Sequence, residues 1–276
     1  MSVHGRPPSV VAGAKPARRG RTHKLRFGNG NAKLDSAIFT FSLPAGYSCP
    51  FAEECLSKAD RHTGRIKDGP YTEFRCYAAS SESRLAVVRR YRWNNLKRLL
   101  ACESKEDMTA LILDSLSPYA GYVRVHESGD FFSQTYFDAW LEVARQRPRT
   151  LFYAYTKALP YWVARKGDIP TNFLLTASYG GTHDHLIEQH GLRSALVVRN
   201  ERTRQLAVSL GLEVDDDDSH AMSPGPSFAL LLHGTQPPGS EASRFLSYLH
   251  SLGEYGHGER ADAIRRERRF ALHLVM

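Results

Sequence analysis

From Tyr122 onward, short apolar segments alternate with amphipathic helical segments, and this alternation limits the folds open to the chain. Strands are expected at residues 122–126, 151–155, 173–177, 195–198 and 228–232. Between them lie a helix that Ser133 would cap and helical patterns at 161–166, 183–190 and 201–210. Repeated strand–helix units of this kind predict a parallel sheet covered by helices.

The ends of these strands favour one arrangement of the sheet. No glycine-rich nucleotide fingerprint follows any strand, which disfavours a Rossmann domain. Polar residues instead follow successive strands, where barrels carry their active sites. We predict an α/β fold with a TIM-like parallel barrel, complete or incomplete, in a single domain over residues 31–276. Its other elements are a strand at 37–41 and helices at 81–101, 108–116, 240–252 and 259–269.

The charge of the chain is positive and unevenly distributed. Lys and Arg number 37 against 29 Asp and Glu, and no acidic residue precedes Asp35. Residues 1–30 are therefore predicted to form a flexible basic arm. Separate basic segments suit a phosphate backbone, so DNA is the expected partner and RNA stays open; solvated faces are the alternative. The residues expected to contact it are Arg18, Arg19, Arg21, Arg89, Arg90 and Arg92.

Hydrophobic residues make up 42% of the chain, enough to fill a substantial core. No apolar run approaches the length of a membrane span, and no apolar signal core follows the N-terminal arginines. We expect a cytoplasmic protein with no membrane partner. The pattern does not indicate an oligomeric state.

Three cysteines fall within an irregular insertion at residues 44–78, in the pattern Cys49-x5-Cys55-x20-Cys76. Three thiolates from one loop can bind a soft or borderline metal ion. His62 could complete a tetrahedral zinc site, whereas an open fourth position would suit a [4Fe–4S] cluster. Three inert, buried cysteines are the alternative. Cys102 ends a predicted helix and is interpreted as structural.

Ionisable residues crowd the end of the strand at 122–126. His126, Glu127 and Asp130 fall in one turn, where such groups can serve as acid, base or nucleophile. Asp130 could instead only cap the next helix. Lys157, after the next strand, could hold an anion or be an ordinary solvated lysine. These four residues are the candidate catalytic groups.

Further polar and glycine residues at or near strand ends are candidates for substrate binding. Glycines there permit a close approach of the backbone to a ligand. The run of aspartates at 215–218 is predicted to be a solvated loop, with a metal or catalytic role as the lesser alternative. The candidate substrate-binding residues are Ser128, Gly129, Phe131, Tyr155, Thr156, Ser178, Gly180, Asn200 and His233.

Several motifs, in their order and spacing, resemble one phage family. They are Cys49-Pro50, Cys76-Tyr77-Ala78, residues 126–132, Tyr155-Thr156-Lys157 and residues 228–234. Together they look like the family called gene product eighty-eight, over roughly residues 39–234. The resemblance implies a phage or prophage origin and action in the infected host cell. Many members carry a second cysteine cluster before the last strand, and here that region has none.

Two enzyme classes are similar to parts of the pattern. Residues 128–131 resemble the SGGFQ motif of tRNA-guanine transglycosylases, zinc-containing barrels that exchange guanine for a 7-deazaguanine base. The leading expectation is therefore a zinc-dependent exchange of this kind in DNA, with Asp130 as nucleophile or base. The early cysteine loop is instead similar to radical SAM enzymes, which implies a [4Fe–4S] cluster and S-adenosylmethionine. A non-enzymatic, metal-stabilised DNA-binding protein is the third hypothesis.

Overall fold

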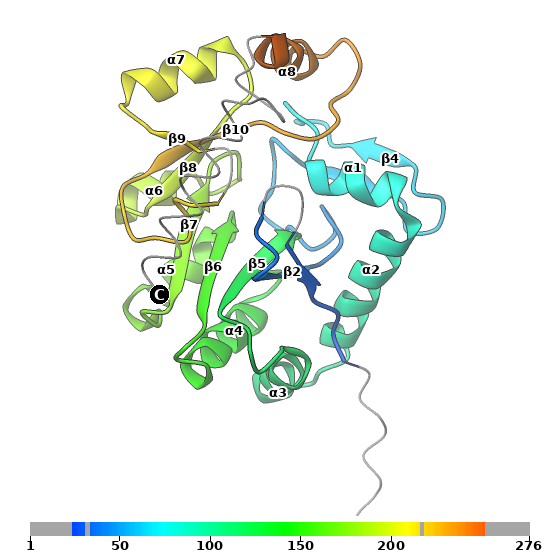
Figure 1. Ribbon diagram of the computed structural model, residues 1–276, viewed down its shortest axis with the longest axis vertical. Coiled ribbons are helices and arrows are strands. Elements are labelled where there is room, and N and C mark those ends of the chain that lie inside the picture. Colours follow the sequence, from blue (N-terminus) through cyan, green and yellow to red (C-terminus); the bar gives the residue numbers. More distant parts are fainter. Residues whose placement is uncertain (1–23, 31–33, 216–217, 252–276) are drawn as a thin grey trace, which may run out of the picture.

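The computed structural model describes residues 24–30, 34–215 and 218–251. Most of the predicted basic arm, including Arg18, Arg19 and Arg21, lies outside the described residues, as does the helix expected at 259–269. Figure 1 shows an α/β architecture in which helices surround one central sheet.

The central sheet has eight strands in the order β1-β2-β5-β6-β7-β8-β10-β9. From β2 to β9 every neighbouring pair is parallel, and β1 alone is antiparallel to its neighbour. The strands are β1 (Gly28–Asn29), β2 (Ile38–Ser42), β5 (Tyr122–Ser128), β6 (Leu151–Thr156), β7 (Phe173–Ser178), β8 (Ser194–Val198), β9 (Val214–Asp215) and β10 (Phe228–Leu231).

The predicted α/β class and parallel sheet are confirmed, but a closed barrel is not found. Strands β2, β5, β6, β7, β8 and β10 follow one another in the sheet in chain order, as in a barrel. Within the described part of the chain the sheet nevertheless stays open, with β1 and β9 as its edges.

The helices are α1 (Tyr77–Arg84), α2 (Ala86–Leu100), α3 (Lys105–Ser115), α4 (Gln134–Gln146), α5 (Leu159–Val163), α6 (His185–His190), α7 (Glu201–Ser209) and α8 (Glu241–Ser251). Ser133 caps α4 as predicted, because its hydroxyl accepts from the backbone N–H of Tyr136. The single helix predicted at 81–101 is wrong. Leu85 takes an extended backbone conformation and divides it into α1 and α2.

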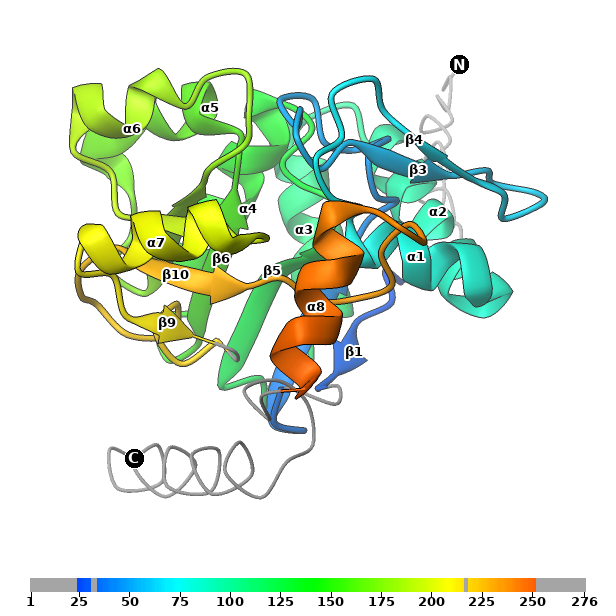
Figure 2. The same ribbon diagram turned by 90° about the horizontal axis from the view of Figure 1, so that it is seen from above.

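The predicted irregular segment also contains a small hairpin. Strands β3 (Ser57–Ala59) and β4 (Ile66–Asp68) pair antiparallel, apart from the main sheet. In Figure 2 the hairpin extends from one side of the molecule, beside α1 and α2. The hairpin therefore begins two residues after Cys55 and ends before Cys76.

The two faces of the sheet have different chemistry. One face packs Phe41, Val125 and Phe152 against Trp140 of α4 and forms the main hydrophobic core. Burial of large apolar side chains of this kind supplies most of the driving force for folding. The other face carries Arg124 and several tyrosines. None of the helices in the described ranges is long and apolar enough to cross a membrane.

Candidate functional site

A cavity of about 180 Å³ lies at the carboxyl ends of the parallel strands. Residues at or near the ends of β5, β6, β7 and β10 line it, as the polar strand ends predicted. The three cysteines of the insertion line it too. The candidate residues in its wall are Cys49, Cys55, Cys76, His126, Glu127, Ser128, Gly129, Asp130, Tyr155, Thr156, Lys157, Ser178 and His233.

The cysteines reach the cavity from two segments of the chain. Cys49 and Cys55 lie in the loop after β2, and Cys76 is the residue at the start of α1. None of the four cysteines forms a disulfide, and Cys102 is outside the cavity. The pKa of Cys49 is raised well above its usual value by burial and by its proximity to Asp130, Cys76 and Cys55. Burial, and next the proximity of Cys55, raise the pKa of Cys76 to about 11.

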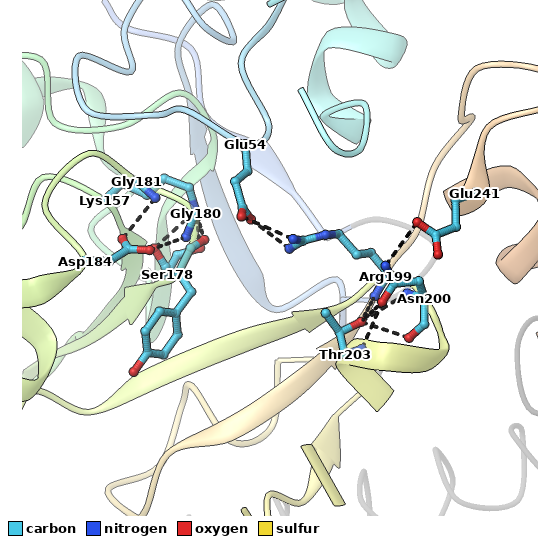
Figure 3. Close-up of polar contacts among 11 residues, drawn as sticks. Glu54, Lys157, Ser178, Gly180, Gly181, Asp184, Arg199, Asn200, Thr203 and Glu241 are labelled. Atoms are coloured by element: carbon cyan, nitrogen blue, oxygen red, sulfur yellow. Dashed lines mark hydrogen bonds and ion pairs between the residues drawn. The ribbon is translucent and has the colours of Figure 1, made fainter. Parts of the chain in front are cut away.

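The loop that carries Cys49 and Cys55 is fixed to the ends of β7 and β8. Backbone N–H groups of Glu53 and Glu54 donate to the carbonyl of Gly180 at 3.2 and 3.0 Å. The Glu54 carboxylate forms an ion pair with Arg199, just beyond β8. Figure 3 shows this pair between the Gly180 turn on one side and the start of α7 on the other. Gly180 therefore holds the loop and does not line the cavity.

Asp130 is buried, and both of its oxygens accept hydrogen bonds from the protein. Oδ1 accepts from the Thr156 hydroxyl at 2.6 Å and from the Phe131 N–H at 2.8 Å; Oδ2 accepts from the Lys157 N–H at 2.8 Å. Burial raises the pKa of Asp130, although these hydrogen bonds oppose the shift. The carboxyl group thus joins the ends of β5 and β6.

Lys157 is also buried, and its ammonium group points to the end of β7. Nζ donates to the Ser178 hydroxyl at 2.6 Å and to the carbonyls of Tyr179 and Ser178 at 2.7 and 3.2 Å. All three acceptors are neutral. A buried cation without a directly bound carboxylate is a group that an anionic ligand can stabilise.

His126 belongs to the hydrophobic core more than to the cavity. Its ring packs against Phe41 and Phe131, and Nε2 lies 2.9 Å from the Tyr136 hydroxyl. Burial lowers the pKa of His126 to about 3, so the imidazole is neutral at physiological pH. This position does not favour the predicted acid–base role. Phe131 is likewise fully buried in the core and does not line the cavity.

Glu127 and His233 lie near Tyr77, on the side of the cavity formed by α1. The Ser42 hydroxyl donates to the Glu127 carboxylate at 3.2 Å, and the Tyr77 hydroxyl donates to the Glu127 carbonyl. The His233 ring lies 4.3 Å from that of Tyr77, between centroids. Apart from its place beside Cys76, nothing in the sequence marks Tyr77 as a site residue.

Arg124 is a cavity residue that the sequence analysis missed. Its guanidinium forms a buried ion pair with Asp218 at 2.9 Å, and the hydroxyls of Tyr153 and Tyr155 donate to the same carboxylate at 3.0 and 3.3 Å. The solvated loop predicted for 215–218 is therefore wrong at both described positions, since Asp215 is also buried. Strand alternation could have indicated this residue, because it places the side chain of residue 124 on the face of the sheet away from Val123 and Val125.

Four further candidates lie outside the cavity. His62 is exposed in the turn of the β3–β4 hairpin, outside the cavity. Asn200 caps α7, where its side chain accepts from the Thr203 N–H, and it does not line the cavity. Arg89 is buried against backbone carbonyls, and Arg92 forms a buried ion pair with Glu82 at 3.0 Å. These positions contradict the ligand role of His62, the substrate role of Asn200 and the phosphate roles of Arg89 and Arg92.

The comparisons with known proteins give the family. Residues 15–248 match the family described as Gene product 88. The chain belongs to this family. Within it, the Gene 88 protein of Mycobacterium phage L5 is 27% identical over 146 residues. That match covers 49% of this chain and 53% of the phage L5 protein, so it spans about half of each.

Membership of the Gene product 88 family supports the resemblance to a phage family. The comparisons do not support the partial similarity to transglycosylases. No solved structure matches the chain. In the described ranges, no group of three or more His, Cys, Asp or Glu side chains is arranged so that it could hold a metal ion.

Proposed function

We propose that the protein is an enzyme in which Cys49, Cys55 and Cys76 bind an iron–sulfur cluster beside the cavity. The observation that carries this proposal is that all three thiols line one cavity together with Lys157 and the residues around Asp130. Thiolates are the usual protein ligands of such clusters, and three of them leave one iron of a [4Fe–4S] cluster open to a substrate or cofactor. The three cysteine side chains must still move closer to one another to ligate the cluster.

The number of available ligands favours a cluster over a closed zinc site. A structural zinc ion takes four protein ligands. His62 lies away from the cysteines, in the hairpin turn, and both Asp130 oxygens already accept hydrogen bonds. Three thiolates suit a centre that keeps one position for a ligand from the cavity, whereas a closed zinc site would need a fourth ligand from the same wall, such as Glu127 or His233.

The electrostatics of the thiols support a bound cation. Burial makes Cys49 and Cys76 harder to ionise, and nearby anionic groups add to this effect: Asp130 and the other cysteines for Cys49, and Cys55 for Cys76. A cationic centre reverses this effect, because it stabilises the thiolates and releases their protons on binding. The buried Lys157 ammonium and the paired Arg124 would then orient an anionic part of the substrate in the cavity.

Base exchange remains a prediction, but the geometry favours it less. A carboxylate nucleophile needs a lone pair free to attack the anomeric carbon. The oxygens of Asp130 instead accept from Thr156, Phe131 and Lys157 and hold two strand ends together. We therefore assign Asp130 a positioning role.

Metal analysis of anaerobically purified protein tests the proposal. We expect about four irons and matching sulfide per chain, with a broad visible absorption band. Cys49→Ser, Cys55→Ser and Cys76→Ser should each lose most of the iron, whereas Cys102→Ser, outside the cavity, should keep it. One zinc per chain and no iron would refute the cluster, and no metal before or after anaerobic reconstitution would refute the metal centre.

Binding of S-adenosylmethionine to the reconstituted protein is the second measurement. The resemblance to radical SAM enzymes implies this cofactor, and equilibrium dialysis would detect it. Loss of binding in the Cys76→Ser protein, with binding kept in Cys102→Ser, would support a cluster with an open iron.

A further inference from the structure

Two cation–aromatic contacts lie side by side between the β3–β4 hairpin and α2. The Lys58 ammonium is 5.2 Å from the centre of the Tyr47 ring, and the Arg61 guanidinium is 5.0 Å from the centre of the Trp93 ring. The rings of Tyr47 and Trp93 are themselves 4.8 Å apart between centroids. Two adjacent aromatic rings, each in contact with a cation, therefore lie at this junction.

Helix α2 extends the same surface. Arg90 precedes Trp93 by three residues and Lys97 follows it by four, and this spacing places all three on one side of the helix. Arg90 and Lys97 are exposed, whereas Arg89 and Arg92 point into the protein. We call Tyr47, Lys58, Arg61, Arg90, Trp93 and Lys97 the basic–aromatic surface.

The protein only partly offsets the positive charge of this surface: after burial, the next cause that raises the pKa of Tyr47 is the proximity of Asp60. Within the described ranges, no ion pair joins Lys58, Arg61, Arg90 or Lys97 to a carboxylate. Asp60 is the nearest acidic residue in the sequence, and Oδ1 accepts from the N–H groups of His62 and Thr63 in its own turn. A cluster of unpaired cations attracts a polyanion.

We propose that the basic–aromatic surface binds a single-stranded nucleic acid, which is the substrate of the neighbouring cavity. Four cations can contact phosphates, and Tyr47, which is 42% exposed although Lys58 and Trp93 already contact its ring, offers aromatic surface to an unstacked base. Bases within a duplex have both faces covered and cannot stack in this way. The proposed phosphate contacts are therefore Lys58, Arg61, Arg90 and Lys97, in place of the buried Arg89 and Arg92.

The chain connects this surface directly to the cysteines. Tyr47 precedes Cys49 by two residues, and the hairpin that carries Lys58 begins two residues after Cys55. A strand bound here would lie along the segment that holds the proposed cluster. As a statement about substrate the inference rests on the proposed function, but the binding itself can be measured without it.

Fluorescence anisotropy with a labelled single-stranded oligonucleotide tests the inference on the full chain. The triple variant Arg61→Gln, Arg90→Gln, Lys97→Gln should bind at least tenfold more weakly. Because it loses about three phosphate contacts, the slope of log K against log salt should fall by roughly 2. Tyr47→Leu should weaken binding with little change in slope, because it removes stacking and no charge.

The control triple Arg149→Gln, Arg202→Gln, Lys105→Gln removes the same charge elsewhere and should bind nearly as the wild type does. Equal losses in the two triples, or wild-type binding by the first, would overturn the proposal. Duplex binding as tight as single-strand binding, or equal competition by polyglutamate, would also overturn it. Iron content is measured in parallel. Normal oligonucleotide binding by an iron-free protein would refute the cluster alone. An iron-loaded protein that does not bind the oligonucleotide would refute the nucleic-acid surface alone.

Discussion

The carboxylate of Glu54 is held by the guanidinium of Arg199 through two contacts, Nη1 to Oε2 at 2.7 Å and Nη2 to Oε1 at 3.2 Å. Glu54 lies between Cys49 and Cys55, and Arg199 lies directly after β8. The pair therefore joins the cysteine loop to the sheet across 145 residues of chain. Two-point contacts of this kind fix direction as well as distance.

Loss of this pair should loosen the cysteine loop without unfolding the protein. Glu54→Gln keeps the shape of the side chain and removes its charge, so we expect a loss of about 1 kcal/mol in the free energy of unfolding. The loop at 44–56 should be cleaved faster by proteases, and the protein should retain less iron. Glu142→Gln, which removes an ion pair on α4, is the control and should change neither. Unchanged proteolysis in Glu54→Gln would contradict the anchoring role.

Gly129 lies in the turn after β5, where the backbone packs closely against Ser48 and Leu43. Its φ is +84°, and a Cβ there would lie 2.5 Å from the Ser48 Oγ and 2.7 Å from the Leu43 Cβ. Gly129→Ala should therefore cost about 3 kcal/mol, from backbone strain together with the steric clash. Gly191 also has a positive φ, +57°, but open space around it. Gly191→Ala should cost only about 1 kcal/mol, and urea unfolding of the two variants separates the effects; equal costs would contradict the clash.

The strand–helix alternation predicted most of the sheet, because each unit is specified by local periodicity. It did not predict the division of the 81–101 helix at Leu85, where no Gly or Pro marks the break. The short β3–β4 hairpin was also missed, since three-residue strands carry too little periodicity to detect.

The sequence predicted the site residues that follow the strand ends. It did not predict those whose position depends on a partner far away in the sequence. His126 was expected at the strand end with Glu127 and Asp130, and it does line the cavity. The pairing of β2 with β5 shifts after Phe41, however, and the His126 ring packs against Phe41 in the core. Asp218 is buried because Arg124, 94 residues earlier, neutralises it. Nothing in a run of aspartates indicates a partner at that separation.

The thiol of Cys76 should titrate at unusually high pH in the metal-free protein. Burial and the nearby Cys55 raise its pKa from 9.0 to about 11. Between these values the folded protein holds the proton and the unfolded chain does not, so the free energy of unfolding should fall as pH rises from about 9 to about 11. Cys76→Ser should lose part of this dependence.

Alkylation by iodoacetamide, resolved by mass spectrometry, measures the Cys76 thiol directly. The reaction of folded protein should reach its half-maximal rate near pH 11, and that of urea-unfolded protein near pH 9. Cys55→Ser removes one cause of the shift and should lower the midpoint in the folded state. A folded-state midpoint near 9 would show that neither burial nor Cys55 raises the pKa of the Cys76 thiol.

Asp218 should be among the most sensitive positions in the fold, although it lies in a run of four aspartates. Asp218→Asn keeps an oxygen that can accept from Tyr153 but leaves the buried Arg124 guanidinium without its counter-charge. We expect a loss of about 3 kcal/mol or more, because an uncompensated buried charge is expensive. Asp168→Asn removes an exposed ion pair with Arg145 and should cost less than about 1 kcal/mol.

The double variant Arg124→Met, Asp218→Leu should recover part of the stability, since it removes both charges. Urea unfolding of the four proteins decides the point: equal costs for Asp218→Asn and Asp168→Asn would show that Arg124 is solvated rather than buried beneath the cavity.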